Sequence, residues 1–174
     1  MPIHTQHRPL PIPSSPDGTL LVAILSNPPL TDGSRSIARV EVASRLLGFS
    51  RFRIVNLLGV PTRSADDVAE AGADGRAWVA ARVPILEALD IADCALLAYG
   101  IQPPGAPARA HFRSQIDWLR GELRARRVPA WTLGGLPRHP SRWQRWTSRV
   151  QPGTPFETAL RDGLLLSSQL LPNS

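Results

Sequence analysis

The sequence predicts an α/β domain of three layers, in which helices cover both faces of a short, mostly parallel sheet of four strands. Two observations support this fold class. Short continuous apolar runs alternate with longer segments in which apolar residues recur at helical spacing, and this alternation is typical of strand–helix–strand units. The composition, 43% hydrophobic and 20% charged over 174 residues, also suits one compact domain with a buried core.

Four segments are predicted to be strands because each is short, apolar and bounded by turn residues. The first covers residues 20–25, between Gly18 and Pro28. A continuous apolar run of this length is typical of a parallel strand that is covered on both faces. The other three predicted strands cover residues 52–58, 92–99 and 128–133.

Helices are predicted where apolar residues recur at intervals of three or four. Residues 76–89 carry Val79, Val83 and Leu86 on one face, and residues 108–127 form the clearest helix. The remaining helices are predicted over residues 34–47, over residues 65–70 after an N-terminal cap at Ser64, and from a capping box at residues 154–157 to about Asp162.

Composition divides the chain into three parts. Residues 1–17 are polar and rich in proline, which predicts a flexible tail. Residues 18–150 hold the predicted α/β domain, and residues 151–174 hold a last helix and an apolar extension that docks either on the domain or on a partner. No apolar stretch reaches the length of a membrane span and no signal peptide is indicated, so we expect a cytoplasmic protein without a membrane partner. The oligomeric state is left open.

The sequence predicts neither a metal nor an organic cofactor. A single cysteine, Cys94, excludes an internal disulfide and a cysteine-based metal cluster, and its apolar surroundings predict a buried structural thiol. The motifs of phosphate-binding loops, dinucleotide-binding folds, zinc proteases and serine hydrolases are absent from the sequence.

Polar residues follow the predicted strands at the points where the strands end. Asn27 follows the first strand, Asn56 lies near the end of the second and Tyr99 closes the third. His139 and Ser141 come after the fourth. Ligands of open α/β sheets bind beyond the carboxyl ends of the strands, so we expect these side chains to share one site. The alternative is that Asn27 and His139 only cap turns.

The basic residues are concentrated in one stretch of the chain. All 20 basic residues are arginine, and with 14 acidic residues they give a net charge of +6. Residues 109–149 hold ten of these arginines but only two acidic residues, a local net charge of +8. A local surplus of this kind favours contact with phosphates or acidic surfaces.

Arginine and tryptophan alternate directly after His139. Arg138, Arg142 and Arg145 suit phosphate groups, and Trp143 offers a ring that stacks on an unpaired base. This pattern predicts a nucleic-acid contact, with DNA favoured as the partner. The alternative is an amphipathic helix whose arginines are solvated while Trp143 and Trp146 pack inward.

Residues 21–143 resemble a bacterial domain family of unknown function. Its members share four motifs in order, which read Asn-Pro-Ser, Asn-Leu, Trp-Gly and Pro-Arg-His-Pro. The corresponding segments here are Asn-Pro-Pro at residues 27–29, Asn-Leu at 56–57, Tyr-Gly at 99–100 and Pro-Arg-His-Pro at 137–140.

More distantly, the same order is similar to the uracil-DNA glycosylase superfamily. This resemblance implies that Asn27 positions the attacking water or the sugar, that Asn56 reads the base edge and that His139 faces the base carbonyl. Tyr99 and Ser141 would line the pocket. The uracil-specific branch carries Asp where Asn27 stands, and the terminal proline of the closing His-Pro-Ser-Pro motif is replaced here by arginine.

The resemblance implies a uracil-DNA-glycosylase-like domain that binds a nucleobase in nucleic acid and hydrolyses its N-glycosidic bond. Two alternatives stay open. One is a non-catalytic DNA- or RNA-binding module that uses the arginine-rich face. The other is an enzyme that acts on free nucleosides or nucleotides.

Overall fold

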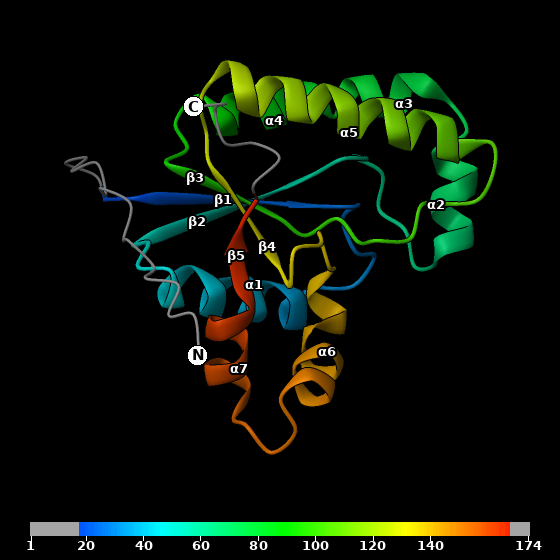
Figure 1. Cartoon of the computed structure of the whole chain (residues 1–174). Coiled ribbons are helices and arrows are strands. Elements are labelled where there is room, and N and C mark those ends of the chain that lie inside the picture. The colour runs from blue at the N-terminus through cyan, green and yellow to red at the C-terminus, as the bar shows by residue number, and fades with distance from the viewer. Residues whose placement is uncertain (1–17, 168–174) are drawn as a thin grey trace.

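The computed structural model describes residues 18–167, which fold around a five-stranded sheet in the order β2-β1-β3-β4-β5 (Figure 1). The strands are β1 (Leu20–Leu25), β2 (Arg51–Asn56), β3 (Cys94–Leu97), β4 (Ala130–Leu133) and β5 (Leu164–Leu166). The first four are parallel, and β5 is antiparallel to β4. The predicted tail, residues 1–17, lies outside the described residues.

The fold class is confirmed as α/β with a mostly parallel sheet, and the predicted number of strands is corrected from four to five. The bounds predicted for β1 match the structure, and every residue of this central strand is buried. The fifth strand, residues 164–166, comes from the start of the apolar C-terminal extension and pairs with β4, while residues 168–174 lie outside the described residues. This pairing covers the backbone edge of β4 that would otherwise be open.

Helices cover both faces of the sheet (Figure 1). One face is covered by α1 (Ser34–Leu46), α6 (Trp143–Val150) and α7 (Phe156–Gly163), and the other by α3 (Gly75–Ala80), α4 (Arg82–Leu89) and α5 (Ala108–Ala125). A short α2 (Ala65–Ala71) stands beyond the end of the sheet, and a single 3₁₀ turn, η1 (Pro140–Arg142), precedes α6. Since β2 and β3 lie on opposite sides of β1, right-handed crossovers send α1 and the α2–α4 segment to opposite faces.

The side chains of β1 alternate between two hydrophobic clusters. Val22 and Ile24 belong to the cluster under α4 and α5. Leu21 and Ala23 belong to the cluster under α1, α6 and α7. The sheet therefore has a core on each face, as its continuous apolar strands require. No helix between residues 18 and 167 is both long and apolar enough to cross a membrane.

The single helix predicted over residues 76–89 is divided at Ala81 into α3 and α4. Pro84 supplies the reason, because it has no N–H for the carbonyl four residues earlier and its ring crowds that carbonyl. Val79 and Val83 are more than half exposed, so their spacing does not mark a buried face. The buried side chains of the two helices are Trp78, Ile85, Ala88 and Leu89.

One of the two predicted helix caps is present. Ser64 and Asp67 form a capping box at the start of α2, each side chain accepting the backbone N–H of the other residue at 3.1 Å. The capping box predicted for residues 154–157 is wrong. Helix α7 begins at Phe156, so Pro155 and not Thr154 is its N-cap, and no side-chain hydrogen bond caps this end.

Candidate functional site

A cavity of about 580 Å³ lies at the carboxyl ends of β1, β2 and β3. The chain leaves β1 toward β2 on one side and returns to β3 on the other side of β1, so the loops that follow β1 and β3 diverge. Divergence of this kind leaves a crevice at the point where the strand order reverses, and ligands of doubly wound folds bind there. The loops after β1, β2, β3 and β4 all contribute to the cavity wall.

Most of the residues predicted from the sequence meet at this cavity. Its wall includes Asn27, Asn56, Tyr99, His139 and Ser141. Arg142 also lines it. Arg138 and Arg145 line a second pocket, of about 380 Å³, that shares part of its wall with the first. Trp143 lines neither of them.

Asn27 joins two loops and still leaves one atom free. Its Nδ2 donates to the hydroxyl of Thr62 and, at 3.2 Å, to the carbonyl of Pro28. A carbonyl can only accept, so these partners fix which end of the amide faces them. The opposite end, Oδ1, has no hydrogen-bond partner among the described residues. Asn27 therefore joins the loops after β1 and β2 through its Nδ2, and Oδ1 is the atom of its amide that stays available at the cavity.

Asn56 is the last residue of β2 and lies beside Leu25 of β1 in the parallel register. It is half-buried, and its side chain forms no hydrogen bond within residues 18–167. An asparagine amide carries two donors and an acceptor on one rigid plane. Asn56 thus presents both kinds of hydrogen-bonding group to whatever fills the cavity.

His139 is held in one tautomer by its own turn. Its Nδ1 accepts the backbone N–H of Ser141 at 3.2 Å and lies 2.9 Å from the hydroxyl of the same residue. Because a backbone N–H can only donate, Nδ1 is unprotonated, and the neutral ring carries its proton on Nε2. Burial lowers the pKa of His139, and the charges of Arg142 and Arg39 lower it further. The ring is therefore a neutral Nε2–H donor at physiological pH.

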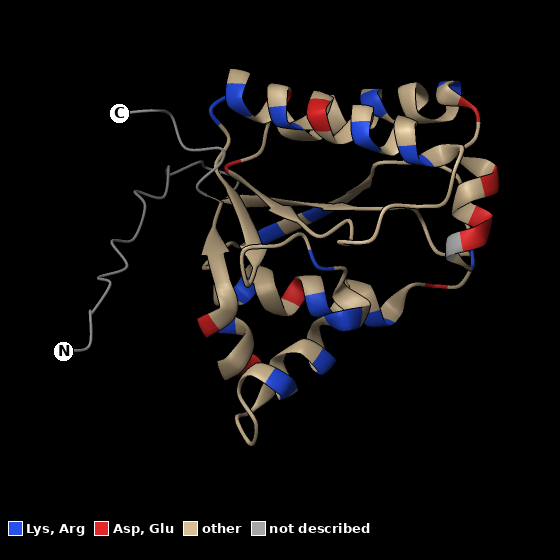
Figure 2. Cartoon of the chain, turned by 45° about the vertical axis from the view of Figure 1, so that its right-hand side comes forward, with Lys and Arg blue, Asp and Glu red and all other residues tan. Residues whose placement is uncertain are grey.

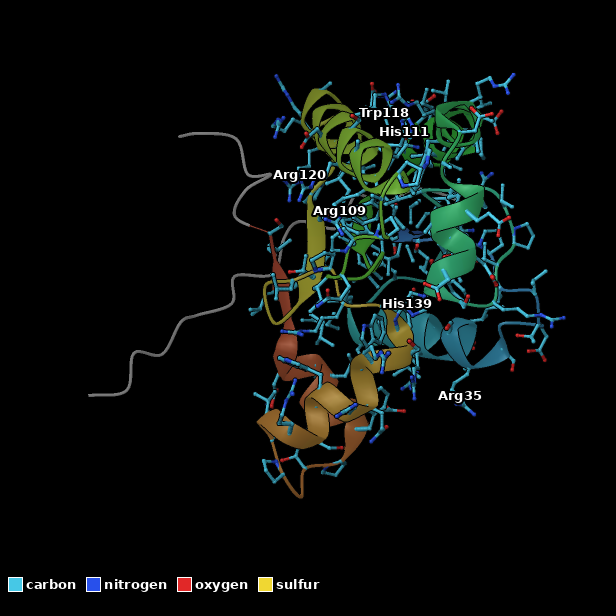
Figure 3. All side chains as sticks on the ribbon, turned by 90° about the vertical axis from the view of Figure 1, so that its right-hand side faces the viewer. Arg35, Arg109, His111, Trp118, Arg120 and His139 are labelled. Carbon is cyan, nitrogen blue, oxygen red and sulfur yellow. The ribbon has the colours of Figure 1, made fainter. Side chains whose placement is uncertain are left out.

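The segment that carries His139 is fixed from two neighbouring elements. Arg39 of α1 donates from Nη1 to the carbonyl of Pro140 at 2.7 Å. On the other side, the backbone N–H of Gly100, directly after β3, donates to the carbonyl of Pro137 at 2.6 Å. In Figure 3, His139 lies between the layer of α5 and the layer of α1 and α6. These contacts position the imidazole without engaging its Nε2.

Trp143 is a core residue, and its predicted contact with nucleic acid is wrong. The side chain is fully buried in the cluster under α1, α6 and α7. Its indole Nε1 donates to the carbonyl of Arg138 at 2.7 Å. A ring without an exposed face cannot stack on a base. The inward-packing alternative holds for this residue, and its indole helps to orient the segment that leads to His139.

Tyr99 forms part of an apolar wall. Its ring meets Phe112 of α5 edge-to-face, with 6.2 Å between the ring centroids. Val68 of α2 lines the same cavity. Burial raises the pKa of Tyr99, and the nearby charge of Arg120 acts in the opposite direction. The phenol is therefore neutral, and this side of the cavity suits a flat apolar ring.

Sequence reasoning missed several residues of the cavity. Asp32 supplies the one carboxylate on the described part of its wall, and it also accepts the backbone N–H of Ser34 at 3.1 Å. Thr62 and Gln102 line the cavity as well. Asp32 lies in the loop between β1 and α1, so the rule that places ligands beyond the carboxyl ends of the strands could have identified it as well.

Cys94 is buried, as predicted, and burial raises the pKa of its thiol to about 11. In the part of the chain that the structure describes, no three His, Cys, Asp or Glu side chains are grouped so that they could hold a metal ion. Comparisons with models of known protein families, with curated protein sequences and with solved structures found no match.

Proposed function

We propose that this chain binds a nucleobase of nucleic acid in the cavity and hydrolyses the N-glycosidic bond of that base. The observation that carries the proposal is the set of free hydrogen-bonding groups on one wall. Asn27 Oδ1 and the Asn56 amide have no partner in the described chain, and the neutral His139 ring keeps Nε2–H available. The uracil-DNA-glycosylase-like arrangement implied by the motifs agrees with this set.

Base recognition is assigned to Asn56 and the apolar wall. The edge of a pyrimidine presents a carbonyl beside an N–H, and an asparagine amide complements both groups at once. Tyr99 and Phe112 offer an apolar surface for the ring of the base. The cavity volume of about 580 Å³ is of the size that encloses a small organic ligand.

His139 stabilises the leaving group in this proposal. As the bond between C1′ of the sugar and the base nitrogen breaks, its electron pair stays with the base, and negative charge develops on the base carbonyl oxygen. The fixed Nε2–H of His139 donates a hydrogen bond to that oxygen. A donor that is already oriented stabilises such charge without reorganising, and in other enzymes one donor of this kind contributes on the order of 100-fold in rate.

The attacking water is assigned to Asn27 and Asp32. The water oxygen forms the new bond to C1′, while Asn27 Oδ1 accepts one of its hydrogens and orients it. Asp32 takes the proton that the water loses and returns it to solvent, and the departing base takes a proton from solvent. An amide is a poor base, so stabilisation of the leaving base carries most of the rate.

The test is incubation of the full chain with DNA oligonucleotides that carry uracil, mismatched or modified bases, followed by alkaline cleavage at abasic sites. We expect cleavage at one class of base, reduced on the order of 100-fold in His139→Ala. His111→Ala is the matched control, because His111 lies on α5 and not on the cavity wall. If the wild type and His139→Ala are equally inert on every substrate, the catalytic part of the proposal fails.

The alternative of a non-catalytic module has its own outcome in the same experiment. Such a module binds the oligonucleotides without producing abasic sites, and its affinity falls as salt rises. It also survives Asn27→Ala, because a module that only binds has no attacking water to orient. An enzyme for free nucleosides would instead cleave a nucleoside and ignore the oligonucleotides.

A further inference from the structure

A second pocket adjoins the cavity, and four of its nine lining residues are arginines. It has a volume of about 380 Å³, and it is defined here as the arginine pocket. Its basic residues are Arg138, Arg142, Arg145 and Arg149, and Trp146 lies among them. Two of these arginines belong to α6, which carries no acidic residue, as Figure 2 shows. The opposite wall comes from residues 100–102, directly after β3.

Within residues 18–167, the arginines of this pocket form no ion pair with an acidic side chain. The ion pairs of the described chain use Arg45, Arg76 and Arg126, none of which lines the pocket. Among residues 18–167, no side-chain hydrogen bond is donated by any of the four pocket guanidinium groups. Four like charges that converge without a counter-charge favour an anion from outside the chain.

Arg138 is fixed in place with an unused donor. Its Nε is buried and has no hydrogen-bond partner in the described chain. The guanidinium carbon lies 5.2 Å from the centroid of the Trp146 ring, a distance typical of a cation–π contact. The backbone at Gly134 and at Gly163 packs directly against the indole of Trp146, since a Cβ at either glycine would overlap the ring. A buried donor held this rigidly is costly until an acceptor reaches it.

We propose that the arginine pocket binds one phosphate group of the ligand whose base occupies the cavity. A guanidinium group can donate two parallel hydrogen bonds to two oxygens of one phosphate. A neutral polar group of a ligand gains less binding energy from a cluster of arginines. The two pockets share Gln102, His139 and Arg142 as a common wall. A ligand that spans this wall is a phosphorylated nucleoside unit, so the inference rests on the proposed function for its base and on the arginines for its phosphate.

The test measures phosphate affinity directly, on the full chain, by calorimetry and by the indole N–H signals in NMR. Three probes are used: inorganic phosphate, a deoxynucleoside 5′-monophosphate compared with its nucleoside, and a single-stranded DNA oligonucleotide. The pocket variant is Arg145→Gln with Arg149→Gln, two exposed positions. The control is Arg113→Gln with Arg124→Gln, which removes the same charge from exposed positions of α5.

We expect the pocket variant to weaken phosphate binding about tenfold or more, as the loss of charge-assisted hydrogen bonds predicts, while the control variant stays within about twofold of the wild type. A loss confined to the oligonucleotide assigns the site to a phosphodiester, and a loss with the monophosphate assigns it to a terminal phosphate. The proposal is overturned if the two double variants bind all three probes equally.

A further variant, Asn56→Ala, distinguishes failure of the arginine-pocket proposal from failure of the proposed function. Asn56→Ala is expected to weaken binding of the monophosphate and to leave the affinity for inorganic phosphate unchanged, because Asn56 contacts only the base. If the base assignment is wrong, Asn56→Ala changes the affinity for neither ligand, and the pocket variant still weakens binding of inorganic phosphate. If the arginine assignment is wrong, Asn56→Ala weakens nucleotide binding while both double variants keep the affinity of the wild type.

Discussion

Asn27 and Thr62 are joined by a hydrogen bond from the Asn27 amide to the Thr62 hydroxyl across 35 residues of sequence. Thr62 is buried, and its backbone N–H donates in turn to the carbonyl of Pro28 at 3.1 Å. These two hydrogen bonds join the loops after β1 and β2 at the edge of the cavity and are called the loop brace. They orient the Asn27 amide so that its oxygen stays available to a ligand.

Thr62→Val is expected to release that brace. The substitution keeps the shape of the side chain and removes one of the two acceptors of the Asn27 amide, so the free energy of unfolding falls by about 1 kcal/mol. The affinity for the base falls as well, because the amide is then held only by the carbonyl of Pro28. Urea denaturation and ligand titration measure the two effects, and Thr62→Ser, which keeps the hydroxyl, restores both. An unchanged affinity in Thr62→Val with lowered stability would show that the brace is only structural.

The lowered pKa of His139 predicts a pH dependence of both binding and stability. Protonation places a hydrogen on Nδ1, opposite the backbone N–H of Ser141, and so breaks the contact that positions the ring. Base binding is therefore expected to hold at neutral pH and to fall as the pH drops through the lowered pKa, although both forms of the ring carry a hydrogen on Nε2. The same group stabilises the folded chain above its unfolded pKa of about 6.5, and that contribution is lost as the pH falls below it.

The titration of His139 is measured by NMR of the imidazole carbon-bound protons, with His139→Ala identifying the signal. The expected midpoint lies below that of a free histidine. A midpoint at or above the ordinary value contradicts the neutral-donor role. His111, which lies on α5, serves as the internal comparison in the same spectra.

The strands and the meeting of the site residues were predictable for a simple reason. A buried parallel strand must be apolar on both faces, and residues 20–25 show this without a break. The carboxyl ends of such strands share one edge of the sheet, which is why Asn27, Asn56 and His139 meet at one cavity. The predictions succeeded where local pattern and sheet geometry determine the outcome.

The failures have two causes: some depend on contacts between distant segments, and others on local patterns that fit more than one structure. The strand β5 is three residues long and carries no local signal beyond its leucines, and it exists because β4 offers an open edge. Arg39 reaches the segment of His139 through the packing of α1 against η1, which no local spacing encodes, whereas Asp32 lies in the loop directly after β1 and was overlooked there. Trp143 was misassigned because arginine–tryptophan alternation fits an amphipathic helix as well as a nucleic-acid surface.

Trp143→Ala is expected to act on stability. Its ring is fully buried, so truncation should lower the free energy of unfolding by about 3–5 kcal/mol. Trp143→Phe keeps most of the volume and loses the hydrogen bond to the Arg138 carbonyl, with a smaller loss. Chemical denaturation measures both variants. A variant that keeps wild-type stability and loses only nucleic-acid binding would show that Trp143 does contact nucleic acid.

Gly134→Ala is expected to disturb the arginine pocket by displacing the ring of Trp146. Gly134 has a φ of +61°, and a Cβ there would overlap the ring of Trp146. The variant should therefore lose about 1–3 kcal/mol of stability through strain and shift the indole on which Arg138 rests. Gly121→Ala is the matched control, because Gly121 lies within α5 with no atom near its Cβ position, and there alanine should stabilise the helix by about 0.5–1 kcal/mol. Thermal unfolding and phosphate titration of both variants give the answer: equal effects of the two substitutions on phosphate affinity would mean that Trp146 does not hold Arg138 in place.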